Sequence, residues 1–323
     1  TIINNTVKTL GTSSHGIYSD VNTAIIKNVN NSISGNVITV SGTTGNGILV
    51  ENSFFNTIRD NNITVKGTGN GISLDNVANN ISIYNNNITS SGLGADGIEL
   101  SSSDNNSIYS NFISTTNLGM GIVLISVSSF NEMRNNVIKT TAGSNAAHGI
   151  LLSSGNSNSV HDNNISISSG SANGIEVDTN NNLAYNNNIT SDAGYGVYLD
   201  TGDNNQIYSN LIRTTTNGRD GIRLRASVNN TIYVNNITTT GANSIGIVLV
   251  TNTKANTIYE NNITTSGSRA YGIYLLNTQN NTFYRNSISS LTAGIVINNT
   301  DKSATTITGA NFTNDTILPC SVG

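Results

Sequence analysis

The sequence of 323 residues is poor in charge, cysteine and proline. Only 10% of its positions are charged, and it contains one cysteine, one proline and no tryptophan. One cysteine cannot form an internal disulfide framework, and no run of about 18 apolar residues indicates a membrane-spanning helix. Lys and Arg number 14 against 18 Asp and Glu, which leaves a net charge of −4 and no basic surface for a phosphate backbone. We therefore expect no nucleic-acid partner and no membrane span.

Asparagine fills 59 positions, and Ile, Val and Thr are also abundant. Disordered chains have few β-branched residues, so this composition favours a folded β-protein. The chain starts at Thr1 without a charged segment followed by an apolar one. We expect that a signal peptide has been removed or was not included, and that the protein is secreted, extracellular or attached to the cell surface.

Two markers repeat along the whole chain with an average spacing of about 25 residues. The first is a glycine followed by Ile or Val, at Gly16, Gly47, Gly71, Gly97, Gly121, Gly149, Gly174, Gly196, Gly221, Gly246, Gly272 and Gly294. The second is an asparagine two residues before an Ile, at Asn36, Asn61, Asn86, Asn111, Asn136, Asn163, Asn187, Asn210, Asn235, Asn261 and Asn286. A single repeat domain over 1–323 follows, with repeats over about 16–313 and a tail over 314–323.

Each repeat contains three short segments in which apolar and polar residues alternate, as in Ile72 and Leu74 against Ser73 and Asp75. This period of two is typical of a half-buried strand. Three strands of a few residues cannot bury an apolar face within one repeat, so successive repeats must stack. The sequence therefore predicts an all-β parallel β-helix of about 12 coils. The regularly spaced asparagines lie on the inner side of the strand ends, where their amides are expected to form hydrogen-bonded ladders.

These repeats resemble the right-handed parallel β-helix family typified by pectate lyases, and in style the short-repeat β-helices of extracellular and archaeal cell-surface proteins. The resemblance covers nearly the whole chain through its Gly-Ile-x-Leu and Asn-x-Ile repeats. It implies a right-handed, single-stranded solenoid. It implies no single function, because the same fold carries lyases, hydrolases, adhesins and inert shells.

One group of ionisable residues falls on three successive repeats: Glu176, Asp178, Asp200, Arg223 and Arg225. Stacked strands would place Asp178 about 5 Å from Asp200, close enough to raise one carboxyl pKa or to share Ca²⁺. Pectate lyases resemble this arrangement in combining Asp-bound Ca²⁺ with a basic Arg. If the protein is an enzyme, Asp178, Asp200, Arg225 and Glu176 are the candidate catalytic residues. The alternative is a set of ordinary cross-strand ion pairs, and outside the enzyme hypothesis we expect no metal and no cofactor.

Two regular columns are predicted on the outer surface. One is a tyrosine stripe at Tyr84, Tyr109, Tyr185, Tyr208, Tyr233, Tyr259 and Tyr284. These tyrosines either only cover the neighbouring strand, as residues of high β-propensity do, or form a contact surface for sugars or a neighbouring subunit. The other column follows the asparagines of Asn-x-Ser/Thr sequons at Asn62, Asn87, Asn164, Asn188, Asn236 and Asn262. Further sequons lie elsewhere, at Asn30, Asn280, Asn298 and Asn314. All ten asparagines are candidates for N-linked glycans. Cys320 could form an intermolecular disulfide.

Leu49, Val123, Leu151 and Val248 occupy the predicted outer face of the Gly-Ile-x-Leu strand and indicate an apolar outer surface. Together with the few ionisable groups, this surface favours a structural protein. We expect an N-glycosylated β-helix that polymerises with itself into a cell-surface sheath, layer or filament. The alternatives are a polysaccharide lyase or hydrolase acting on the same face, and a carbohydrate-binding adhesin.

Overall fold

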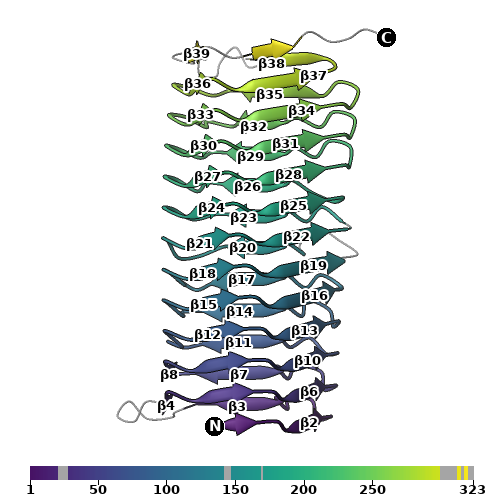
Figure 1. The fold of residues 1–323 in the computed structure, drawn as a ribbon, viewed down its shortest axis with the longest axis vertical. Helices are drawn as coiled ribbons and strands as arrows, with labels where there is room; N and C mark the ends of the chain where they lie inside the picture. Colours follow the sequence, from purple (N-terminus) through teal and green to yellow (C-terminus); the bar gives the residue numbers. More distant parts are fainter. Residues whose placement is uncertain (21–27, 142–146, 169, 299–310, 314–315, 319–323) are drawn as a thin grey trace. The chain divides into compact units, whose positions relative to one another are not determined.

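The computed structural model describes residues 1–20, 28–141, 147–168, 170–298, 311–313 and 316–318. All regular secondary structure in these ranges is β-strand. The chain divides into two compact units, unit 1 over Thr1–Ala172 and unit 2 over Asn173–Gly323. Within each unit the same three strands recur in every coil and build three parallel sheets, called A, B and C here (Figure 1).

Unit 1 contains three sheets and one short extra pair. Sheet A consists of β1 (Ile2–Ile3), β5 (Ser32–Ser34), β9 (Thr57–Arg59), β12 (Ser82–Tyr84), β15 (Ser107–Tyr109), β18 (Glu132–Arg134) and β21 (Ser159–His161). Sheet B consists of β2 (Thr6–Thr9), β6 (Val37–Val40), β10 (Asn62–Val65), β13 (Asn87–Ser90), β16 (Phe112–Thr116), β19 (Val137–Thr141) and β22 (Asn164–Ile167). Sheet C consists of β3 (Ile17–Ser19), β7 (Ile48–Glu51), β11 (Ile72–Asp75), β14 (Ile98–Ser101), β17 (Ile122–Ile125) and β20 (Ile150–Leu152). The extra pair is β4 (Asn28–Val29) with β8 (Ser53–Phe54).

Unit 2 repeats the three sheets. Its sheet A consists of β24 (Leu183–Tyr185), β27 (Gln206–Tyr208), β30 (Thr231–Tyr233), β33 (Thr257–Tyr259), β36 (Thr282–Tyr284) and β39 (Asn311–Thr313). Its sheet B consists of β25 (Asn188–Ser191), β28 (Leu211–Thr214), β31 (Asn236–Thr239), β34 (Asn262–Thr265), β37 (Ser287–Ser290) and β40 (Thr316–Leu318). Its sheet C consists of β23 (Ile175–Val177), β26 (Val197–Asp200), β29 (Ile222–Arg225), β32 (Ile247–Val250), β35 (Tyr271–Leu276) and β38 (Ala293–Asn298).

The register of the sheets places equivalent repeat positions on top of one another. In sheet B, for example, Asn62 pairs with Asn87 and Ile63 with Ile88, in parallel. Ile63 and Ile88 are fully buried, and stacks of such side chains form the core of each unit. The prediction of a right-handed parallel β-helix is therefore confirmed as to fold. The prediction of one domain over the whole chain stays a prediction.

Buried asparagines line the turn from sheet A to sheet B. The side-chain oxygen of Asn86 accepts hydrogen bonds from the backbone N–H of Asn61 at 3.1 Å and from its amide at 3.0 Å. The amide of Asn61 also donates to the carbonyl of Ile33 at 2.9 Å. The same bonds repeat from Asn36 to Asn163 in unit 1 and from Asn187 to Asn286 in unit 2. Each ladder thus satisfies backbone groups that the turn would leave buried and unpaired.

The glycine that opens each sheet C strand is required by close packing. A Cβ atom on Gly196 would lie 2.2 Å from Cγ2 of Ile212 and 2.6 Å from the carbonyl oxygen of Gly221. Both distances are shorter than a carbon atom tolerates. The glycine marker of the sequence therefore reports the approach of two backbones in adjacent coils.

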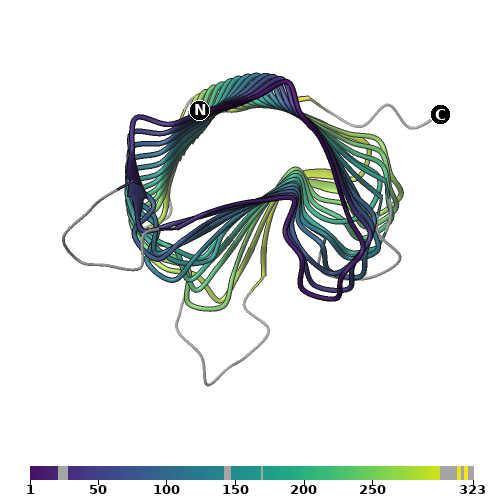
Figure 2. The same ribbon diagram turned by 90° about the horizontal axis from the view of Figure 1, so that it is seen from below.

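The outer face of sheet C is less exposed than the sequence suggests. Leu49, Val123, Leu151 and Val248 are between 1% and 9% exposed. In the view along the coils, the turns that join sheet B to sheet C project past this face of sheet C (Figure 2). The expectation of an apolar outer surface is wrong, because these side chains are covered within the chain.

Candidate functional site

The polar group predicted from the sequence lies on the outer face of sheet C in unit 2. Glu176 pairs with Tyr198 in the sheet register, and Tyr198 pairs with Arg223. Asp200 pairs with Arg225 in the same way. Adjacent strands are about 4.8 Å apart, so β23, β26 and β29 place carboxylates, a tyrosine and two arginines in two neighbouring short columns.

Arg225 and Asp200 form a two-pronged ion pair. Nε of Arg225 donates to Oδ1 of Asp200 at 2.8 Å, and Nη2 donates to Oδ2. The side chain of Arg225 is 51% exposed and that of Asp200 19%. The hydrogen bond to Asp200 raises the pKa of Arg225 above its usual range, with a further contribution from Tyr198. Both carboxylate oxygens of Asp200 thus accept hydrogen bonds from Arg225, which makes Asp200 a poor candidate for proton transfer.

Asp178 differs from Asp200 because one of its oxygens, Oδ1, is buried without a hydrogen-bond partner. Burial raises the pKa of Asp178 to about 7, and the negative charges of Glu176 and Asp200 raise it further against the opposing effect of Arg225. Near neutral pH this carboxyl group exists in both protonation states. Asp178 is thus suited to donate or accept a proton.

A second cluster shares Arg223 with the first and adds Tyr195, Arg219 and Asp220, which the sequence analysis did not single out. Nη1 of Arg223 donates to Oδ2 of Asp220 at 2.8 Å. The guanidinium carbons of Arg223 and Arg219 lie 5.1 and 5.6 Å from the ring centroid of Tyr195. The ring of Tyr195 also lies 5.4 Å from that of Tyr198. Tyr195, Arg219 and Asp220 occupy the turns before the repeat glycines Gly196 and Gly221, outside the strand pattern of the sequence.

Asp220 anchors this second cluster. It is 2% exposed, and its Oδ1 accepts the backbone N–H of Ile245 at 2.9 Å. Burial raises the pKa of Asp220 to about 6, although the N–H of Ile245 and the charges of Arg223 and Arg219 act in the opposite direction. Asp220 is therefore ionised at neutral pH and fixes the position of Arg223.

Sheet C of unit 1 has a different charge pattern. Its strands contain Glu51, Asp75 and Glu99 but no Lys or Arg. Burial raises the pKa of both Asp75 and Glu99, and each carboxylate raises the pKa of a neighbour further. This face of unit 1 is purely acidic.

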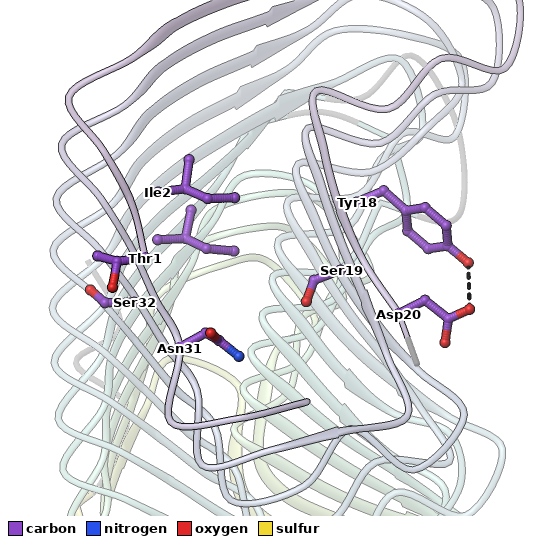
Figure 3. Close-up of a pocket in the computed structure, with 8 residues that line it drawn as sticks. Thr1, Ile2, Tyr18, Ser19, Asp20, Asn31 and Ser32 are labelled. Atoms are coloured by element: carbon purple, nitrogen blue, oxygen red, sulfur yellow. Dashed lines mark hydrogen bonds between the residues drawn. The ribbon is translucent and has the colours of Figure 1, made fainter. Parts of the chain in front are cut away.

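A pocket also lies at the first coil of unit 1, between sheets A and C (Figure 3). Thr1, Ile2, Asn31 and Ser32 form one side, and Tyr18 donates a hydrogen bond to Asp20 on the other at 3.1 Å. Residue 1 forms part of the wall. We assign no function to this pocket.

The tyrosine stripe forms stacks of parallel rings on sheet A. Successive centroids in unit 2, from Tyr185 to Tyr284, are 4.7–5.0 Å apart, and Tyr84 stacks on Tyr109 in unit 1 at 4.8 Å. Neighbouring rings cover the faces of the inner tyrosines, so a sugar could reach only their edges. A contact of the tyrosine stripe with sugars or a second subunit stays a prediction. Such a contact would involve the edges of the rings or the outer faces of the rings at the two ends of a stack.

The remaining predicted positions are dispersed. In sheet B, Asn62 and Asn87 are exposed sequon asparagines, and the amide of Asn87 donates to Asn62 at 3.2 Å. Glycosylation stays a prediction. Asn314 and Cys320 lie outside the described residues.

Metal ligands do not converge in the part of the chain that the structure describes. It contains no group of three or more His, Cys, Asp or Glu that could hold a metal ion. Both ring nitrogens of His161 face carboxylates, Asp162 at 2.7 Å and Glu132 at 3.1 Å. His15 and His148 lie in other coils. The described part also has no helix long and apolar enough to cross a membrane.

Solved structures share the fold at low sequence identity. The A-module of the mannuronan C-5 epimerase AlgE6 from Azotobacter vinelandii has 15% identity and a TM-score of 0.68, over 95% of this chain and 90% of that one. The periplasmic alginate epimerase AlgG has 13% identity and a TM-score of 0.57, over 89% and 77% of the two chains. Tailspike protein 3 of bacteriophage CBA120 has 11% identity and a TM-score of 0.54, over 100% and 53%. No curated protein matches the sequence significantly.

A family model described as periplasmic copper-binding protein (NosD) matches residues 1–139, 29–220 and 121–266. The dispersed donors of the described residues do not fit the copper ion that this description implies. The matched segments nevertheless cover most of the sequence and follow its repeats. The chain therefore belongs to the NosD family of β-helix proteins.

Proposed function

We propose that this protein binds a polysaccharide along the outer face of sheet C in unit 2 and transfers protons to or from it, with Asp178 as the acid–base residue. The observation that carries the proposal is the partly buried Asp178, whose Oδ1 lacks a partner and whose pKa lies at about 7. Tyrosine rings and arginines beside it supply the aromatic and polar contacts typical of sugar sites.

The comparisons support this proposal only at the level of the fold. The similar structures include epimerases named for mannuronan and alginate, together with a phage tailspike. Identities of 15% or less carry no residue roles across. The periplasmic description of the family supports a location outside the cytoplasm.

Self-assembly into a sheath, layer or filament has less support. One of its grounds was an apolar outer face of sheet C, and Leu49, Val123 and Val248 are buried there. We therefore favour the carbohydrate-active alternative.

The test is a binding and turnover screen of the full chain on a panel of polysaccharides, followed by Asp178→Asn. Loss of the titrating carboxyl should lower turnover by about 10²–10⁴-fold while binding persists. Asp75→Asn is the matched control, because Asp75 also has a buried, unpartnered Oδ1 and a raised pKa but lies on the acidic face of unit 1. Absence of both binding and turnover across the panel would overturn the proposal.

A further inference from the structure

Resting on the proposed function, we infer that Asp200 is a positioning residue of the same site, which occupies Arg225 and thereby keeps this arginine from pairing with Asp178. A carboxylate held in an ion pair with an arginine stays ionised and is no longer suited to take up and release a proton near neutral pH. The inference gives Asp200 a role that the proposed function leaves open.

The three residues belong to three successive coils of unit 2. Val177 pairs with Leu199, so the residues that follow them, Asp178 and Asp200, lie one coil apart. Asp200 in turn pairs with Arg225 in the next coil. Adjacent strands are about 4.8 Å apart. Asp200 therefore stands between an aspartate on one side and an arginine on the other.

Arg225 spends its carboxylate-binding edge on Asp200. Nε donates to Oδ1 at 2.8 Å and Nη2 donates to Oδ2. A guanidinium has five N–H donors in a planar fork, and two parallel donors matched to one carboxylate are its strongest arrangement. The side chain of Arg225 is 51% exposed, so it has room to turn if this partner is removed.

Asp178 is the acceptor to which Arg225 would then turn. Its Oδ1 is buried without a hydrogen-bond partner, and a buried acceptor without a partner gains from any donor that becomes free. The charge of Arg225 already acts on Asp178 across the intervening coil. Two coils separate their Cα atoms by roughly 10 Å, which an extended arginine and an aspartate side chain span together.

The charged groups around Asp178 in unit 2 fix the sign of the expected effect. Burial is the main cause that raises the pKa of Asp178 to about 7; the charges of Glu176 on β23 and Asp200 on β26 add to the rise, and that of Arg225 on β29 opposes it. The other arginine of β29, Arg223, donates to a carboxylate in the turn before its strand. Removing the carboxylate of Asp200 takes away a negative charge and releases a positive one. Both effects favour the ionised form of Asp178 and lower its pKa.

The experiment follows the titration of Asp178 directly, by NMR of the full chain with carbon-13 in its aspartate carboxyl groups and without a polysaccharide. The signal that disappears in Asp178→Asn identifies the residue. In Asp200→Asn we expect its titration midpoint to fall by about one to three pH units, the effect of a nearby opposite charge. In Arg225→Gln the midpoint should rise. Loosening of the coil would instead expose Asp178 and lower the midpoint in both variants, so opposite directions report the charges.

A double variant separates the release of Arg225 from the loss of one charge. In the Arg225→Gln background, Asp200→Asn removes a carboxylate but frees no arginine, and its effect on the midpoint should shrink to less than half. Glu260→Gln is the matched control. It removes the same charge from unit 2 and also takes the partner, at 3.3 Å, of an arginine one coil further on, Arg285, but on sheet A. It should leave the midpoint of Asp178 unchanged.

The outcomes separate the two proposals. An unchanged midpoint in Asp200→Asn, or an equal fall with and without Arg225, would overturn the present inference and leave Asp178 as the acid–base residue. With a polysaccharide that the chain turns over, the pH profile of turnover should move to lower pH in Asp200→Asn together with the midpoint. If the midpoints moved as expected and no polysaccharide were bound or turned over, the proposed function would fail while the control of Arg225 by Asp200 would stand.

Discussion

Replacing Asp96 by asparagine should stabilise the protein at neutral pH and not at acid pH. Asp96 is 9% exposed and lies in the turn before β14. Its Oδ1 accepts the backbone N–H of Met120 at 2.6 Å. Burial raises the pKa of Asp96 from 3.8 to about 7; the bond from Met120 opposes this rise and the charge of Glu99 adds to it.

The sign of the effect follows from proton binding. Between pH 3.8 and 7 the folded chain holds a proton on Asp96 that the unfolded chain releases, so stability falls as pH rises. At about 1.4 kcal/mol per pH unit the full loss is about 4 kcal/mol. An asparagine cannot ionise and keeps the acceptor oxygen. Asn46 and Asn70 already do this in the two preceding coils, accepting backbone N–H groups at 2.8 and 2.9 Å.

The assay is urea unfolding of Asp96→Asn and the unmodified chain at several pH values from 4 to 8. We expect similar stability near pH 4 and an advantage for the variant of about 2–4 kcal/mol near pH 8. Asp104→Asn is the control, because Asp104 also accepts a backbone N–H, from Ser129 at 2.7 Å, but is less buried. A difference between Asp96→Asn and the unmodified chain that does not change with pH would refute the reasoning.

Three further predictions concern backbone geometry and metal binding. Gly196→Ala should destabilise unit 2 by about 1–3 kcal/mol or more in urea unfolding because its Cβ would meet the Gly221 carbonyl; Gly218→Asn, at a φ of 68° in open space, should cost far less. Val234→Asn should raise the free energy of unfolding by about 1 kcal/mol, because Val234 has a φ of 56° that asparagine tolerates better; a loss would contradict this. Copper(I) competition with a chromogenic chelator should show no tight site in Cys320→Ser, and stoichiometric binding by this variant would contradict the dispersed donor set.

The fold could be predicted from the sequence because its determinants are local and repeated. Alternation of apolar and polar residues defines each strand, and the spacing of about 25 residues sets which residues stack. Glycine and asparagine markers then report the positions where backbones approach or need partners, as Gly196 and Asn86 show. Each of these features depends on one coil and its immediate neighbours.

The site was harder to predict because its properties depend on burial and on the turns. Asp178 was recognised as a candidate, but the loss of water contact that raises its pKa depends on the coils around it. The sequence pattern placed Leu49 and Val123 on the correct face of the strand, but it predicted that they are exposed, whereas both are buried. Tyr195 and Asp220 lie in turns of two successive coils. The alternation of apolar and polar residues indicates which way a side chain points only within a strand, so it gave no information on these two side chains.

The turn before the repeat glycine shows why Tyr195 is significant. In this position Asn70, Asp96 and Asn173 each offer a side-chain oxygen to a backbone N–H in the next coil, at 2.9, 2.6 and 2.8 Å. Asp220 does the same at 2.9 Å. Tyr195 lies between Asn173 and Asp220 in this column, and its side chain has no amide or carboxylate oxygen. The column is not uniform, because Met120, Ile245 and Tyr271 occupy the same position in other coils. At Tyr195 the guanidinium groups of Arg223 and Arg219 lie within cation–π distance of the ring, so contacts between side chains of adjacent coils replace the hydrogen bond that an asparagine or aspartate would accept.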